Sequence, residues 1–128
     1  MPQALESWHA IVASGDVRRL DDLIADDAVF HSPIVFTPQA GKAITVKYLT
    51  AALSVLGNDS FRYVAEWTAA NSAVLEFHVE IDGILVDGAD FITWTADGKI
   101  SDFKVMIRPL KAIDIVLRKM GEELARLT

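Results

Sequence analysis

The sequence predicts an α+β fold in which a curved antiparallel sheet is packed by three N-terminal helices plus a C-terminal helix. Apolar residues recur at spacings of three and four over residues 1–57 and 110–127. Residues 61–108 are instead rich in β-branched and aromatic residues and are divided by Asp-Gly turns. The chain has 128 residues. Because a domain has about 150, residues 1–128 are expected to form a single domain.

Two short helices are predicted at the N-terminus. Gly15 is expected to end the first helix, and Asp16 to cap a second helix over residues 17–24. The apolar face of the first helix consists of Leu5, Trp8, Ile11 and Val12.

A short strand and a third helix are predicted next. Residues 28–32 form the extended segment, and the prolines after it predict a loop up to Gly41. Helical spacing returns over residues 42–56, with Gly57 in the position of a C-terminal cap.

Four long antiparallel strands and a final helix complete the prediction. Asp82-Gly83 and Asp97-Gly98 are typical hairpin turns, and Pro109 suits the first turn of the helix over residues 110–127. The strands are expected at residues 61–69, 73–81, 84–95 and 100–108.

Composition excludes several classes of function. With no cysteine, thiol catalysis and cysteine-bound zinc are impossible. A net charge of −6 disfavours nucleic acid and anionic membranes as partners. Apolar runs are far too short to span a bilayer, and a cytoplasmic location is expected.

Alternation along the strands assigns an unusual residue to the core. Leu75 and Phe77 belong to an apolar face, and the same logic points Asp90 inward beside Ile92. A carboxyl group would then lie among apolar side chains. Gly88 offers an alternative, because a bulge there would reverse the orientation of the residues after it.

The chain resembles the nuclear transport factor 2-like superfamily, which includes SnoaL-like polyketide cyclases and ketosteroid isomerases. The resemblance implies a cone-shaped α+β fold and is more specific to fold than to activity. It lies in residues 8–16, 24–33 (IADDAVFHSP), 41–49, 89–100 (ADFITWTADGKI) and 103–113 (FKVMIRPLKAI).

The resemblance to ketosteroid isomerase implies a partial active site. Asp90 stands eight residues before Gly98, as does that enzyme's oxyanion-stabilising acid, and is expected to face a pocket. At the position of the general base this chain has Ser32, and at that of the phenolic donor it has Trp8. A serine without its own base does not remove an α-proton, so isomerisation by that mechanism is not expected.

Other reactions of the superfamily leave a small set of candidates. Epoxide hydrolysis needs an arginine in the pocket, but Arg62 and Arg108 have outward parity. A dehydratase or cyclase needs an acid and a base, for which His31, Ser32 and Asp90 are the candidate catalytic residues.

The other two histidines are not candidates for catalysis or for metal binding. His9 and His78 are expected to be surface or interface residues. No two histidines have the spacing of metal ligands, so we expect no metal and no cofactor.

Three functions remain open. The protein is a cofactor-independent lyase, isomerase or cyclase using Asp90, a binding protein for a small apolar molecule, or a structural homodimer with a filled core. The expected ligand-binding walls are Trp8, Phe30, Tyr63, Trp67, Phe77, Val79 and Val105. A homodimer is expected through outward-facing strand residues, namely Glu76, His78, Glu80, Thr93, Lys104, Met106 and Arg108.

Overall fold

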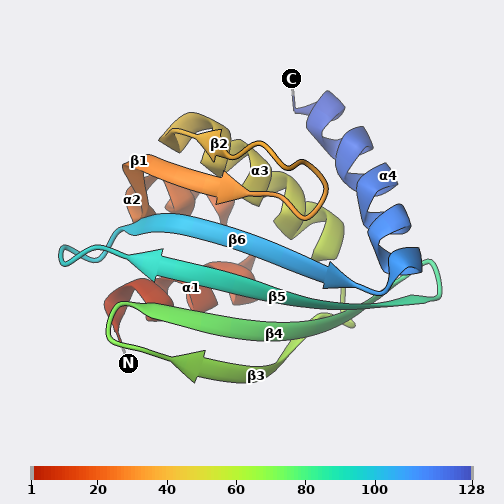
Figure 1. The fold of residues 1–128 in the computed structure, drawn as a ribbon, viewed down its shortest axis with the longest axis horizontal. Coiled ribbons are helices and arrows are strands. Elements are labelled where there is room, and N and C mark those ends of the chain that lie inside the picture. Colours follow the sequence, from red (N-terminus) through yellow and green to blue (C-terminus); the bar gives the residue numbers. More distant parts are fainter. Residues whose placement is uncertain (1, 128) are drawn as a thin grey trace.

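The computed structural model describes residues 2–127 and has the predicted α+β class. One sheet carries α1, α2 and α3 on one face, and α4 packs at one end (Figure 1). Its elements are α1 (Gln3–Ser14), η1 (Val17–Arg19), α2 (Leu20–Leu23), β1 (Ile24–His31), β2 (Gln39–Ala40), α3 (Lys42–Leu56), β3 (Arg62–Thr68), β4 (Ser72–Ile81), β5 (Ile84–Trp94), β6 (Ile100–Arg108) and α4 (Leu110–Arg126).

The sheet is mixed rather than purely antiparallel. Its strand order is β2-β1-β6-β5-β4-β3, and the predicted meander from β3 to β6 is antiparallel throughout. β1 pairs parallel to β6, with Phe30 opposite Phe103. Turn residues identify local hairpins, but nothing local specifies the pairing of two strands so far apart in the chain, and the purely antiparallel prediction missed this pair.

The second helix is shorter than predicted. Gly15 ends α1 with a φ of 72°, and its N–H donates to the Ile11 carbonyl at 2.8 Å. The Asp16 side chain does not cap a helix; its Oδ1 accepts from Arg18 Nε at 3.0 Å. Ile24 pairs with β6 instead of extending α2, because pairing in the sheet overrides the weak preference of an isolated turn for helix.

Two further differences lie around the first strand. β1 begins at Ile24, earlier than expected, and the loop after it contains β2, where Ala40 pairs with Val29. A strand of two residues has no alternation from which a sequence can predict it. The third helix and its end at Gly57 are as predicted.

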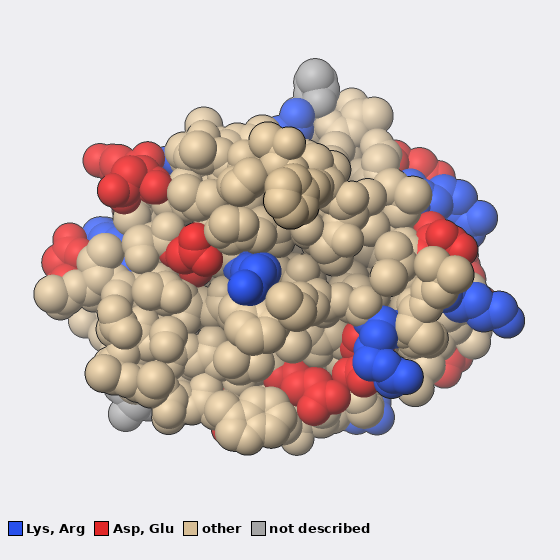
Figure 2. All heavy atoms as spheres, viewed as in Figure 1, with Lys and Arg blue, Asp and Glu red and all other residues tan. Residues whose placement is uncertain are grey.

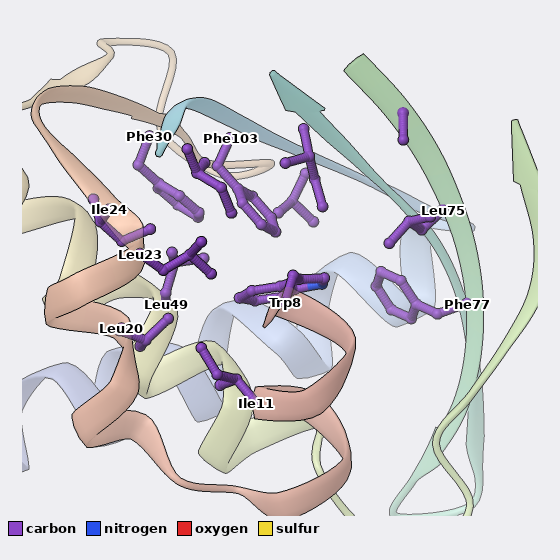
Figure 3. Close-up of a cluster of buried hydrophobic side chains, with 14 of the residues drawn as sticks. Trp8, Ile11, Leu20, Leu23, Ile24, Phe30, Leu49, Leu75, Phe77 and Phe103 are labelled. Atoms are coloured by element: carbon purple, nitrogen blue, oxygen red, sulfur yellow. The ribbon is translucent and has the colours of Figure 1, made fainter. Parts of the chain in front are cut away.

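The core lies between the sheet and the helices. Trp8 projects from α1 between Phe103 of β6 and Phe77 of β4, the two strands that flank β5 (Figure 3). The rings of Trp8 and Phe103 meet edge to face at a centroid distance of 4.8 Å. None of the helices within residues 2–127 has the length and apolar composition to span a membrane.

Gly88 preserves the alternation of β5 and makes room for Phe77. The β4–β5 register runs without a shift, so the alternative of a bulge at Gly88 is wrong. Gly88 lies opposite Phe77, and a Cβ there would be 2.2 Å from the Cζ atom of that ring. The absent side chain lets the Phe77 ring lie over the backbone of β5, two residues from Asp90.

The irregularity of the sheet is in β3 instead. Tyr63 pairs with Phe77, but Ala65 pairs with Glu76, so Val64 is an extra residue in the ladder. Such a bulge reverses the orientation of the residues after it. Tyr63 therefore keeps its inward orientation, whereas Trp67, which shares its parity, lies on the outer face.

Gly88→Ala is expected to destabilise the protein by about 1–3 kcal/mol, because the added methyl overlaps the Phe77 ring. Equilibrium unfolding in urea measures the change. Gly121→Ala is the matched control, since a Cβ at this exposed position of α4 meets no described atom within 4 Å. It should stabilise by up to about 1 kcal/mol.

The same measurement in a Phe77→Leu background isolates the overlap. Gly88→Ala should cost less there, because the smaller side chain no longer fills the space above the glycine. An equal cost in both backgrounds would contradict the role given to Gly88.

Candidate functional site

A cavity of about 580 Å³ lies between the concave face of the sheet and the helices α1, α3 and α4. Side chains from the sheet and from all three helices line it, among them Trp8, Leu49, Phe77, Val105 and Met120. The lining is mostly apolar, and the volume lies in the range of small-molecule sites. The size and lining suit a small, largely apolar molecule.

Asp90 lies in this cavity at the end of a chain of hydrogen bonds. It comes from β5 and is only 6% exposed. The Tyr63 hydroxyl donates to Asp90 Oδ2 at 2.6 Å, and Trp8 Nε1 donates to the Tyr63 hydroxyl at 2.9 Å. We call these three residues the Trp8–Tyr63–Asp90 chain.

Burial sets the protonation of the Asp90 carboxyl. It raises the pKa of Asp90 from an ordinary 3.8 to about 7, and the hydrogen bond from Tyr63 opposes only part of the shift. Burial, together with the adjacent Asp90 carboxylate, also raises the pKa of Tyr63 well above its ordinary value. Within residues 2–127, no lysine, arginine or histidine forms an ion pair with Asp90. Asp90 therefore gains or loses a proton near neutral pH.

The Trp8–Tyr63–Asp90 chain leaves one oxygen of the Asp90 carboxyl group for a ligand. An indole N–H can only donate, so the Tyr63 hydroxyl accepts from Trp8 and directs its single proton to Oδ2 of Asp90. In a neutral carboxyl group the carbonyl oxygen is the better acceptor, which favours the proton of neutral Asp90 on Oδ1. That oxygen has no hydrogen-bond partner among the described residues, and the residue lines the cavity.

Five of the predicted wall residues line the cavity and two do not. The five are Trp8, Phe30, Tyr63, Phe77 and Val105. Val79 is buried in the core but does not line the cavity. Trp67 is 58% exposed on the outer face, so its assignment as a wall is wrong. The bulge at Val64 causes that error, because alternation assumes an unbroken ladder.

The two polar residues predicted to assist Asp90 are engaged elsewhere. Ser32 does line the cavity, but its Oγ accepts from the N–H groups of Ile34 and Val35 at 3.0 and 3.3 Å. His31 does not line it; its Nε2 lies 2.9 Å from Asp102 Oδ1. Adjacent strand residues point to opposite faces, so His31 is corrected to a residue of the outer face.

Sequence reasoning missed three features of the cavity, the first being that Arg62, whose parity is outward, lines it. The phenol beside the acid is present, but Tyr63 of β3 supplies it rather than a residue of the first helix. His9, expected at the surface, lines the cavity and pairs with Glu66 at 2.8 Å. Its position on the first helix, one residue after Trp8, does not predict this contact, because its partner Glu66 is 57 residues away in the chain.

One described group has the side chains to hold a metal ion. Glu76, His78 and Asp87 on the outer face bring their ligand atoms within 4.8 Å of one another. Arg108 Nη1 lies 3.2 Å from Asp87 Oδ2 and supplies positive charge there. The pKa of Glu76 is raised above its ordinary value. The main cause is its hydrogen bond with Asp87, and burial adds to it. With the ion pairs from His78 to Glu76 and Asp87, these contacts form a network of charges on the outer face.

Comparisons with known proteins agree with this architecture. A family model described as a SnoaL-like domain matches residues 5–103. A structure described as a steroid delta-isomerase from Pseudomonas aeruginosa is 35% identical, with a TM-score of 0.91 and coverage of 97% of this chain and 90% of that one. A search of curated proteins gives no match.

Two further structures are similar in fold. An uncharacterised protein with a cystatin-like fold from Silicibacter pomeroyi is 26% identical, with a TM-score of 0.86 and coverage of 95% and 85% of the two chains. An epoxide hydrolase/cyclase-like enzyme of pyran ring formation in salinomycin is 16% identical, with a TM-score of 0.66 and coverage of 82% and 88%. At that identity the second likeness concerns the fold alone.

Asp90→Asn is expected to stabilise the protein increasingly as pH rises from about 4 to about 7. In this range folded wild type retains a proton that the unfolded chain releases, so wild-type stability falls with pH. The amide removes this titration and still accepts from Tyr63, so its advantage should reach the order of a few kcal/mol above pH 7. Urea unfolding at several pH values measures the difference.

Asp59→Asn is the control, because Asp59 is an exposed carboxyl at the edge of the same cavity. Its stability difference from wild type should stay nearly constant over this range. An equally flat difference for Asp90→Asn, or ordinary titration of Asp90 by NMR, would contradict the assignment.

Proposed function

Because the chain belongs to the SnoaL-like domain family, we propose that it binds a small, largely apolar molecule and exchanges a proton with it through Asp90. One observation carries the proposal: a carboxyl group with a pKa of about 7 lies in an apolar cavity of about 580 Å³. A general acid works best when its pKa is near the operating pH. The reaction class is lyase, isomerase or cyclase, and proton transfer of this kind needs no cofactor.

The proposed step uses the free oxygen of Asp90. Neutral Asp90 donates from Oδ1 to a carbonyl or phenolate oxygen of the ligand. Tyr63 holds Oδ2 and stabilises the carboxylate once the proton has moved. In an apolar cavity such fixed donors act more strongly than in water, because no solvent has to reorganise.

The structural comparison supports a ligand class. The steroid delta-isomerase structure covers nearly all of this chain at 35% identity. The fused, largely apolar rings of a steroid suit a mostly apolar cavity with a buried acid at its wall. We therefore propose a planar or fused-ring ketone or phenol.

A binding protein is the second candidate, in which Asp90 only orients the ligand. It is favoured by the Ser32 hydroxyl, which holds a turn at the position expected for a general base. The third possibility, a filled core, is disfavoured by the volume of the cavity.

We also propose that the outer face of the sheet forms a homodimer. Trp67 and Met106 are 58% and 51% exposed there, beside acidic Glu76 and basic Arg108. Figure 2 shows this face as largely uncharged, with scattered acids and bases. A twofold axis would bring two copies of the patch together, so that opposite charges pair across it.

Titration with 2-naphthol, followed by Trp fluorescence, tests ligand binding. Wild type should show saturable binding. Asp90→Ala should weaken it by about tenfold or more, because the hydroxyl of the probe loses its partner. Phe77→Ala should also weaken it through lost apolar contact.

Phe91→Ala is the control, since Phe91 lies on the outer face beneath Lys104 Nζ, 5.1 Å from the ring centroid. Its affinity should match wild type. No saturable binding, or affinity unchanged by both cavity substitutions, would show that the cavity is not the functional site.

Light scattering at micromolar concentration tests the dimer. Met106→Lys should give a monomer, because the new charge would be buried in the interface. Leu110→Lys, at a 73% exposed position of α4, should leave the dimer intact. A monomeric wild type would contradict the proposal.

A further inference from the structure

We infer that His9, held by Glu66, is a second proton-transfer group of the cavity, acting as a general base on the carbon next to a ligand carbonyl held by Asp90. This inference rests on the proposed function and narrows its substrate class to ketones that can enolise. It supplies the base that the sequence lacks at the position of Ser32.

His9 lies in the cavity beside Tyr63. It comes from α1, lines the cavity and presents its ring to the ring of Tyr63 at a centroid distance of 5.4 Å and an angle of 88°. Tyr63 bonds to Asp90 through its hydroxyl. One tyrosine side chain therefore separates His9 from the acid, and a small ketone can extend along that ring between them.

The hydrogen bond to Glu66 supplies the second step. His9 Nε2 lies 2.8 Å from Glu66 Oε1, and both side chains are 31% exposed. Glu66 reaches the helix because the Val64 bulge turns it toward the inner side of the sheet, opposite buried Leu75. Without the bulge, alternation would place it outside.

This bond determines which nitrogen of neutral His9 is basic. A carboxylate accepts, so Nε2 carries the hydrogen and Nδ1 keeps its lone pair. Nδ1 has no hydrogen bond to any residue between 2 and 127. A base oriented by a carboxylate through its other nitrogen is the usual arrangement of histidine catalysis.

The step balances with these two groups alone. Nδ1 of His9 takes a proton from the α-carbon, and the electron pair of that C–H bond forms the C=C bond of an enol. The carbonyl π electrons move to oxygen, which takes the proton of neutral Asp90. Protonated His9 then returns a proton to the same carbon or to its vinylogous neighbour, while Asp90 recovers its own.

Exchange of α-protons of 2-tetralone for deuterium, followed by NMR in D₂O, tests the inference. Wild type should accelerate exchange, and His9→Gln should lower the acceleration by about 100-fold or more, the usual contribution of a general base. Glu66→Gln should lower it less. Neither should change 2-tetralone affinity, measured by Trp fluorescence, by more than about threefold.

His31→Gln is the matched control. His31 also bonds to a carboxylate, Asp102 at 2.9 Å, with similar exposure, but it does not line the cavity. It should exchange like wild type. Urea midpoints close to wild type would show that the loss in His9→Gln is not a loss of fold.

The outcomes separate this inference from the proposed function. Binding of 2-tetralone without accelerated exchange, or equal exchange in His9→Gln and wild type, overturns the role of His9 and leaves ligand binding in place. Failure of both 2-tetralone and 2-naphthol to bind overturns the proposed function as well.

Discussion

The burial of one carboxyl group without a counterion is the constraint on which the site depends. Moving Asp90 out of water favours its neutral form, and among the side chains of residues 2–127 only the Tyr63 hydroxyl bonds to its carboxyl group. Tyr63 in turn accepts from Trp8, so helix α1 and strands β3 and β5 meet at a single line of hydrogen bonds. The same line holds the acid in place and leaves one of its oxygens toward the cavity.

A glycine in β5 and a bulge in β3 make this arrangement possible. The missing side chain at Gly88 lets the Phe77 ring lie against β5 and form a cavity wall close to Asp90. The bulge at Val64 lets one strand send Tyr63 to the acid and Glu66 to α1. A regular strand would place residues 63 and 66 on opposite faces of the sheet.

The two faces of the sheet have different chemistry. The concave face is mostly apolar and carries the Trp8–Tyr63–Asp90 chain and the His9–Glu66 pair, whereas the outer face pairs acids with bases, as in Asp87 with Arg108. Family membership therefore accounts for the scaffold, and individual side chains account for its use. The 35% identical isomerase structure shares nearly the whole fold, yet in this chain the Ser32 hydroxyl only holds a turn at the position expected for a general base.

The sequence by itself determined the elements whose residues repeat locally. Helical spacing placed α1, α3 and α4, strand alternation placed β3 to β6, and alternation with an unbroken register placed Asp90 inside. Only the tertiary structure decided the parallel pairing of β1 with β6, the exposure of Trp67 and the meeting of His9 with Glu66. Those features depend on contacts between distant segments and on one extra residue in a strand, and neither leaves a periodic trace in the chain.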